Sequence, residues 1–216
     1  RNDGRMLTGL KFILEDDDND NLTVYADDDG TYNFDNEDDF LDNAVAFYEP
    51  GGYKCYYFGG GDDGAMRTNK TTVEIDGENH NFYFEKSGSK KGAGVTGEKD
   101  DKLYQSGMLL KADSDDKYVV VDKTTKYTTN AAGEKVLDYV TYNKLDDAKE
   151  FMAQDDVLES NTPVDADGKI DLGNNNKKKA EDISEAYTIG YKAYGSSDMT
   201  THEYFLVNTS GKVIDN

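Results

Sequence analysis

The sequence predicts a mostly β protein of stacked β-hairpins, solenoid-like, with two short helical insertions. Three observations predict this fold. The apolar runs are short and alternate with polar residues, turns that contain glycine separate them, and two aromatic runs, YYF at 56–58 and FYF at 82–84, share one pattern. Alternation with a period of two is typical of strands that bury one face.

The composition favours a folded chain with a thin, aromatic-rich core. The chain has 216 residues, 16 tyrosines, no tryptophan and a formal net charge of −21. Nucleic acid and anionic membrane surfaces would repel such a chain, so we expect neither as a partner. No stretch reaches the roughly 20 apolar residues of a membrane span. The single cysteine, Cys55, excludes an internal disulfide, and its aromatic neighbours predict a buried thiol.

In the first half, we expect one hairpin and one helix. Val73 and Ile75 alternate with polar residues before Asp76-Gly77, which predicts a hairpin with a loop slightly longer than two residues. Helical spacing of apolar residues over 36–48 predicts a helix with Asn36 as its N-cap. Acidic residues fill its first turn, and Pro50 is expected to follow its end.

In the second half, alternating or apolar runs predict strands at 117–122, 187–193 and 203–208. The last strand is expected to turn at 209–211 and pair with 212–214, which closes the chain as a hairpin. Apolar spacing predicts a second helix over 143–154, and 160–180 is too polar to form a packed element. We therefore divide the chain into a hairpin-repeat region, 1–142, and a continuous second region, 143–216.

Irregular repeats support the stacked arrangement. NDGRMLTG at 2–9 and DDGAMRTN at 62–69 share Asp-Gly, one residue, Met, one residue and Thr, and YQSGMLL at 104–110 adds a further Gly-Met unit. Turns with glycine near lysine recur at 130–136, 165–171 and 208–214. Repeated units of this size bury their apolar faces only by stacking on their neighbours.

These motifs resemble the cell-wall-binding repeat proteins of Gram-positive bacteria, which include choline-binding and glucan-binding repeats. CYYFGGGDDGAMRTN at 55–69 and NDGRMLTGL at 2–10 carry the resemblance best, and EYFLVNTSGKVIDN at 203–216 shares it. The resemblance implies stacked hairpins on a secreted or surface-attached protein of a Gram-positive bacterium. It also implies shallow aromatic sites for choline or sugar rings. Cys55 and Asn81 stand where the family pattern has tryptophan.

The two aromatic runs supply the candidate ligand-binding residues, which are Tyr56, Tyr57, Phe58, Phe82, Tyr83 and Phe84. In an extended strand, Tyr57 faces away from its two neighbours, and Tyr83 faces away from Phe82 and Phe84. We expect both phenylalanines of the second run in the core and the two central tyrosines outside it. The same tyrosines also fit ordinary cross-strand pairs, so the pattern alone leaves both interpretations open.

The sequence gives little support for a metal site or a catalytic site. DADGKID at 165–171 resembles part of a calcium-binding loop, but Pro163 and Asn174 would occupy two carboxylate positions, so we predict no metal site. His80 and His202 lie near no nucleophile motif, and no phosphate-binding loop is present. We therefore expect neither an enzyme nor a cofactor.

The sequence as a whole predicts a non-catalytic module that binds bacterial cell wall polymer or extracellular polysaccharide through repeated aromatic contacts. Several weak contacts on one chain would act together by avidity. The alternative is a structural spacer or protein-interaction module that keeps the repeat scaffold without a ligand site. The two differ in whether the outward tyrosines contact a ligand.

Overall fold

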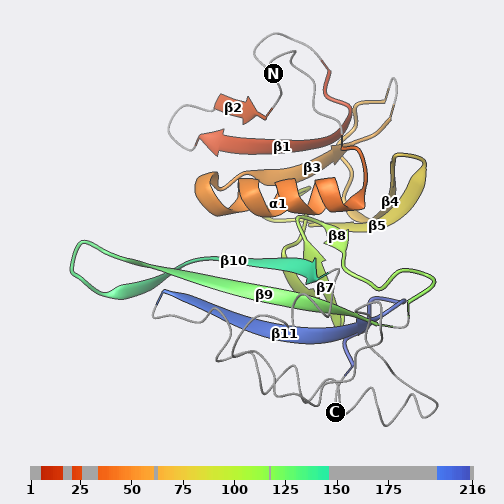
Figure 1. The fold of residues 1–216 in the computed structure, drawn as a ribbon. Coiled ribbons are helices and arrows are strands. Elements are labelled where there is room, and N and C mark those ends of the chain that lie inside the picture. Colours follow the sequence, from red (N-terminus) through yellow and green to blue (C-terminus); the bar gives the residue numbers. More distant parts are fainter. Residues whose placement is uncertain are drawn as a thin grey trace, which may run out of the picture. The chain divides into compact units, whose positions relative to one another are not determined.

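The protein is described from a computed structural model, which covers residues 6–16, 21–25, 34–60, 63–116, 118–145 and 199–214. Within these residues the chain is mostly β, as the sequence predicts, with three antiparallel sheets and one helix (Figure 1). The chain forms two compact units. The first comprises Arg1–Gly97 with Tyr104–Leu109, and the second comprises Glu98–Leu103 with Leu110–Asn216.

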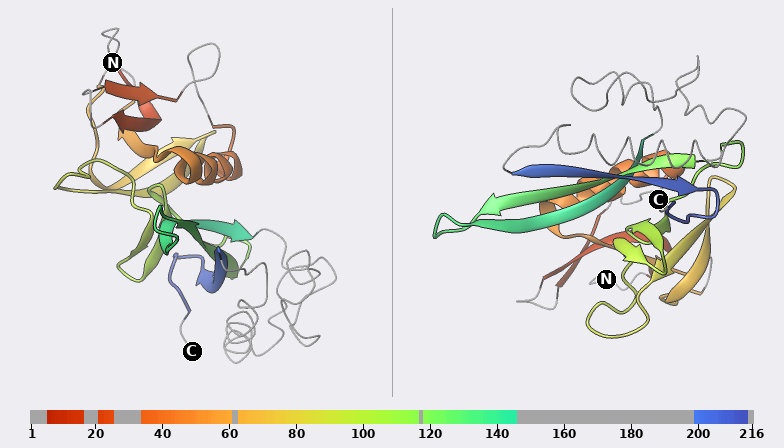
Figure 2. Two further views of the ribbon diagram at one scale, coloured as in Figure 1. Left: turned by 90° about the vertical axis from the view of Figure 1, so that its left-hand side faces the viewer. Right: turned by 90° about the horizontal axis from the view of Figure 1, so that it is seen from below.

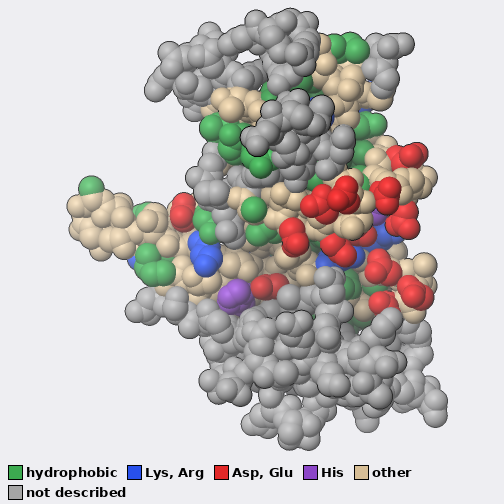
Figure 3. Space-filling view, turned by 45° about the horizontal axis from the view of Figure 1, so that its top comes forward, with side chains coloured by type: hydrophobic (Ala, Val, Ile, Leu, Met, Phe, Trp, Pro, Cys, Tyr) green, Lys and Arg blue, Asp and Glu red, His purple; other side chains and the backbone are tan. Residues whose placement is uncertain are grey.

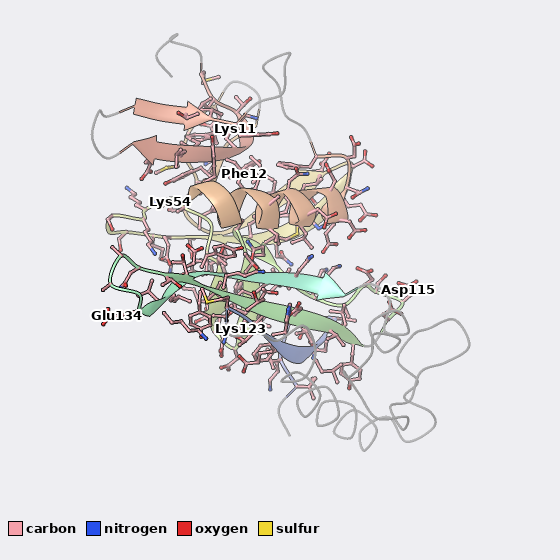
Figure 4. All side chains as sticks on the ribbon, turned by 60° about the vertical axis from the view of Figure 1, so that its left-hand side comes forward. Lys11, Phe12, Lys54, Asp115, Lys123 and Glu134 are labelled. Atoms are coloured by element: carbon pink, nitrogen blue, oxygen red, sulfur yellow. The ribbon has the colours of Figure 1, made fainter. Side chains whose placement is uncertain are left out.

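A three-stranded sheet and the helix belong to the first unit. The sheet has the order β2-β1-β3, with β1 in the centre. Its elements are β1 (Gly9–Asp16), β2 (Asn21–Val24), β3 (Lys54–Phe58) and the helix α1 (Glu37–Gly51). Phe12 points from β1 toward α1 (Figure 4) and stacks on Phe40 of the helix, with the ring centroids 5.8 Å apart. Aromatic packing therefore joins the helix to this sheet.

Helix α1 begins where the sequence predicts but ends later. The Asn36 side chain accepts a hydrogen bond of 2.8 Å from the Asp39 amide, which confirms Asn36 as the N-cap. The helix continues through Pro50 to Gly51, so the prediction that Pro50 follows its end is wrong. The residue that ends the helix is Gly52, whose φ of 67° places it in the left-handed region.

A five-stranded sheet has the order β4-β5-β8-β7-β6. Its strands are β4 (Asn69–Ile75), β5 (Glu78–Phe84), β6 (Gly97–Lys99), β7 (Lys102–Gln105) and β8 (Met108–Leu109). The predicted hairpin is confirmed as β4–β5, but its loop contains only Asp76 and Gly77. Both have positive φ, 48° and 80°, as a type I′ turn requires, because that turn matches the twist of the strands.

The third sheet belongs to the second unit and has the order β10-β9-β11. Its strands are β9 (Tyr118–Thr129), β10 (Lys135–Leu145) and β11 (Thr200–Asn208). The views in Figure 2 show β11 beside β9 and the β9–β10 hairpin extending past it. Strands β9 and β11 confirm those predicted at 117–122 and 203–208.

The predicted helix over 143–154 is wrong at its start. Asn143, Lys144 and Leu145 pair with Asp122, Val121 and Val120, so they end strand β10. Cross-strand pairing here overrides the helical spacing of the apolar side chains. The predicted region boundary at 142 consequently falls inside β10. The remainder of that helix, the polar stretch 160–180 and the strand predicted at 187–193 lie outside the described residues.

Two of the three recurrent glycine turns have the same hydrogen-bond pattern. Asn130 Oδ1 accepts from the amides of Ala132 and Glu134, and the Gly133 amide donates to the Asn130 carbonyl. The turn at 208–212 repeats this pattern, with Asn208 in the place of Asn130. This turn joins β11 to 212–214 and confirms the closing hairpin. The turn at 165–171 lies outside the described residues.

The segment 92–95 connects strand β3 of the three-stranded sheet to strand β5 of the five-stranded sheet. The Gly94 amide donates to the Cys55 carbonyl of β3 at 2.7 Å, and the Val95 amide donates to the Tyr83 carbonyl of β5 at 3.0 Å. Gly94 also lies directly against the backbone of residues 106–107, where a Cβ atom would come within 2.3 Å of the Ser106 oxygen. Only glycine fits this crossing without a backbone shift.

Replacing Gly94 with alanine should therefore destabilise the protein strongly. We expect Gly94→Ala to lower the free energy of unfolding by about 3 kcal/mol, at the upper end of overpacking costs, because backbone atoms must move. Urea unfolding followed by circular dichroism measures the change. Gly60→Ala is the matched control, since a Cβ atom at residue 60 meets nothing within 4 Å. Equal stability of the two variants would contradict the close approach at Gly94.

Candidate functional site

A continuous row of aromatic rings forms the centre of the first unit. Neighbouring ring centroids lie 5.0–6.3 Å apart along the row. In order, the rings are those of Phe34 with Phe12, then Phe40, Phe82, Phe84 and Tyr57. Phe34 and Tyr57, at the two ends of the row, are half-buried, and the rings between them are buried. Burial of these rings compensates for the small aliphatic core.

Two of the predicted site residues belong to this core. Phe82 and Phe84 are 2% and 0% exposed, and their rings stack with an interplanar angle of 9°. This confirms that both face the core. Fully buried rings contact no ligand without unfolding, so the two residues support the site and do not form it.

Tyr83 is also buried, although the sequence places it outside the core. Strand alternation does direct it to the other face of β5 from Phe82 and Phe84. On that face it packs with Val95, Tyr104 and Leu109 and is 4% exposed. The expectation of an outward Tyr83 is wrong because the side chains of Val95, Tyr104 and Leu109 pack around it on this second face.

Tyr56 and Phe58 lie on one side of β3. Tyr56 is buried with Ile13 and Ala93, whereas Phe58 is only half-buried at the edge of the same cluster. Phe58 pairs with Met66, which is 39% exposed. We name the half-buried Phe58 and the exposed Met66 together the Phe58 surface.

Tyr57 lies on the opposite side of β3, beside an ion pair. One face of its ring stacks on Phe84 at 6.3 Å. The Arg67 amide donates to the Tyr57 carbonyl at 2.8 Å, which places Arg67 opposite Tyr57, and the Arg67 side chain pairs with Asp63. Both charged side chains pack over Gly59. We name the group of Tyr57, Gly59, Asp63 and Arg67 the Tyr57 surface.

A hydrogen-bonded carboxylate fixes the neighbouring Tyr56. Its hydroxyl donates to Glu15 Oε1 at 2.6 Å, and Lys54 donates to the other oxygen at 3.1 Å. The hydrogen bond from Tyr56 is the largest cause that lowers the pKa of Glu15, and Lys54 adds to it against the opposing effect of burial. Burial first, and then the Glu15 carboxylate, raise the pKa of Tyr56. The pair positions β1 and β3 and leaves Tyr56 unavailable to a ligand.

The structure also brings together residues that sequence reasoning missed. His202 Nδ1 lies 2.9 Å from Asp122 Oδ2 across strands β11 and β9, and Thr124 Oγ1 donates to the same carboxylate at 3.2 Å. Asp122 and His202 are 80 residues apart in the sequence, so only the pairing of β9 with β11 shows that they are neighbours. Thr124 also lies at Nδ1 of His202, on the same ring nitrogen as Asp122. A nucleophilic triad instead places its hydroxyl at the opposite ring nitrogen.

The shifted pKa values of Lys123 and Cys55 reflect structural roles. Burial alone would lower the pKa of Lys123, but its 2.7 Å hydrogen bond to Glu203 and the surrounding negative charge raise it, so Lys123 is a charged cross-strand partner. Burial raises the pKa of Cys55, so the thiol is protonated and inert, as predicted. Among the described residues, no three acids, histidines or cysteines gather as a metal site, and no helix is long and apolar enough to span a membrane.

In comparisons with known proteins, the chain matches no family model, no curated protein and no solved structure.

The Tyr56–Glu15 hydrogen bond should make stability depend on pH. Since the folded pKa of Glu15 is lowered, the bond stabilises the protein above the ordinary pKa of 4.5, and this contribution is lost as pH falls through the folded pKa. Tyr56→Phe should cost about 1 kcal/mol at neutral pH, discounted for the partial exposure of Glu15, and much less at pH of about 3.

Urea unfolding of both proteins across this pH range measures the difference. Tyr127→Phe, on β9, serves as the control and should show no such trend. A difference between wild type and Tyr56→Phe that stays constant with pH would rule out the proposed linkage.

Proposed function

We propose that this protein is a non-catalytic module that binds bacterial cell wall polymer or extracellular polysaccharide. The observation that carries the proposal is the Tyr57 surface, where a half-buried ring stands beside an exposed Asp63–Arg67 pair. Sugar rings present flat C–H faces together with hydroxyl groups, and an aromatic ring beside hydrogen-bonding side chains complements both. Phe58, on the other side of β3, offers a second, purely apolar contact.

The charge of the protein narrows the class of ligand. Figure 3 shows many acidic side chains exposed on the described residues. The first turn of α1 carries three of the acids in the chain, Glu37, Asp38 and Asp39. With a net charge of −21, the chain would repel polyanionic polymers. Neutral polysaccharide is therefore the favoured ligand, and a tryptophan cage for choline cannot form in a chain without tryptophan.

The stacked-repeat scaffold is part of the same proposal. Three strands, β1, β4 and β6, begin at Gly9, Asn69 and Gly97, and each of these residues has positive φ. Met6 lies over Gly64, and Met66 lies in the same way over Gly92. KKGAGVTG at 90–97 thus aligns with DDGAMRTN at 62–69 and forms a further, degenerate repeat unit. The two segments share the spacing of glycine and threonine, but KKGAGVTG lacks the methionine.

The localisation follows from the resemblance to Gram-positive wall-binding repeats. A module of this class would act outside the cell, either secreted or attached to the surface. Its weak single contacts would gain strength when several operate on one polymer. The two aromatic surfaces on β3 would supply such contacts from one strand.

A spacer or protein-interaction module without a ligand site is the second candidate. The observation that favours it is burial, since Tyr56, Phe82, Tyr83 and Phe84 all lie in the core. In that case the aromatic runs only stabilise the fold, and Tyr57 is simply the last ring of the aromatic row. Wall binding distinguishes the two candidates.

Co-sedimentation with purified Gram-positive cell walls, with soluble neutral glucan as competitor, tests the proposal. Tyr57→Ala should weaken the affinity for walls about fivefold, because contact of one sugar ring with an aromatic side chain contributes on the order of 1 kcal/mol. Tyr57→Phe should retain binding, since it keeps the ring.

Tyr127→Ala, which removes a half-buried tyrosine of the second unit, is the matched control and should bind as wild type does. Thermal unfolding of each variant separates lost binding from lost structure. Failure of the wild-type protein to sediment with walls would favour the spacer.

A further inference from the structure

We infer that the Asp63–Arg67 pair binds adjacent hydroxyl groups of a neutral pyranose ring whose C–H face lies on Tyr57. This inference rests on the proposed function, and it assigns the specificity of that site to two side chains outside the aromatic runs. Aromatic rings accept many sugars, so the hydrogen-bonding side chains beside them determine which hydroxyl pattern is bound.

Strand pairing places Arg67 beside Tyr57. Strand pairing of Phe58 with Met66, together with the hydrogen bond from the Arg67 amide to the Tyr57 carbonyl, puts Arg67 directly across from Tyr57. Side chains that face each other across antiparallel strands project from the same side of the sheet. The Arg67 side chain therefore projects beside the Tyr57 ring, whereas Met66 and Phe58 project from the other side.

The Asp63–Arg67 pair packs against the backbone at Gly59. A Cβ atom on Gly59 would lie 2.8 Å from Asp63 Oδ2 and 2.9 Å from Arg67 Nη2, so both groups rest on the Gly59 backbone. The Gly59 amide donates to the Ala65 carbonyl at 3.0 Å, which fixes the base of the turn. A pre-positioned pair loses little side-chain freedom on binding, which favours affinity.

The hydrogen-bonding groups of Asp63 and Arg67 complement those of sugar hydroxyls. The carboxylate of Asp63 only accepts hydrogen bonds, and the planar guanidinium of Arg67 only donates them. Each sugar hydroxyl both donates and accepts, so two neighbouring hydroxyls can meet the carboxylate and the guanidinium together. The side chains of Arg67 and Asp63 are 47% and 44% exposed, which leaves part of each accessible. Their opposite charges compensate each other, so the pair suits neutral hydroxyls better than a phosphate or an ammonium group.

Periodate treatment of cell walls provides a direct test, because periodate cleaves the bond between carbons that carry adjacent hydroxyls. Purified walls are used untreated, or oxidised with periodate and then reduced with borohydride to remove the aldehydes. Wild-type protein should sediment with untreated walls and lose most of its binding to treated walls. Asp63→Asn and Arg67→Gln should each weaken binding to untreated walls about tenfold, as expected for a lost hydrogen bond to a charged group.

Two further variants separate binding from stability. The double variant Asp63→Arg with Arg67→Asp keeps an ion pair but exchanges the hydrogen-bond donor and acceptor. It should therefore fold normally, while its binding to untreated walls should be weakened. Glu74→Gln, which changes an exposed acid on β4, is the control for charge and should bind as wild type does.

Equal binding to treated and untreated walls, or wild-type binding by Asp63→Asn and Arg67→Gln, overturns the inference. If Tyr57→Ala still weakens binding in that case, the proposed function stands without it. No binding of the wild-type protein to untreated walls overturns both.

Discussion

The contact of Gly94 with the Ser106–Gly107 backbone is the constraint on which the first unit depends. The Gly107 amide donates to Val95, and the Tyr83 amide donates to Gly107, so two chain segments cross where neither has room for a side chain. This crossing lets 92–95 bond to β3 and β5 at once. Without it, the two sheets would share no backbone hydrogen bonds at this point, and Tyr83 would lose the cover that buries it.

The aromatic row is the second organising element, and its position follows from the crossing. Because the sheets are fixed through 92–95, rings from β1, α1, β5 and β3 meet in one line. A chain with so many charges has few aliphatic side chains to bury, so large flat rings supply the buried area. The row reaches the surface at Tyr57, and the ring that a ligand would meet is thus supported by the core. We regard this as the physical basis for a rigid site on a small scaffold.

Short sequence motifs predicted local structure. Strand pairing between residues far apart in the sequence determined the features that the sequence did not predict. Asn36 and its acidic first turn, and Asp76-Gly77 between alternating runs, determine a helix start and a hairpin within a few residues of sequence. Tyr83 shows the limit, since alternation predicts which face of β5 it lies on but not that Val95, Tyr104 and Leu109 pack against it there. At 143–145, helical spacing is overridden by pairing with β9. For the candidate site, the sequence supplied Tyr57, whereas Arg67 and Asp63 became visible only through the pairing of residues 57 and 67.

The asparagine-anchored turn at 130–134 has a consequence for how the second unit folds. Glu134 lies at the turn of the β9–β10 hairpin (Figure 4), and the Asn130 side chain closes this turn with bonds to its own neighbours. Hairpins of this kind close within microseconds, whereas β11 pairs with β9 over a sequence separation of 80 residues, as between Lys123 and Glu203, which is slower to form. We expect β9 to spend the interval with one edge open. Lys123 and Lys126 on that strand carry the charges that discourage pairing with another chain until β11 arrives.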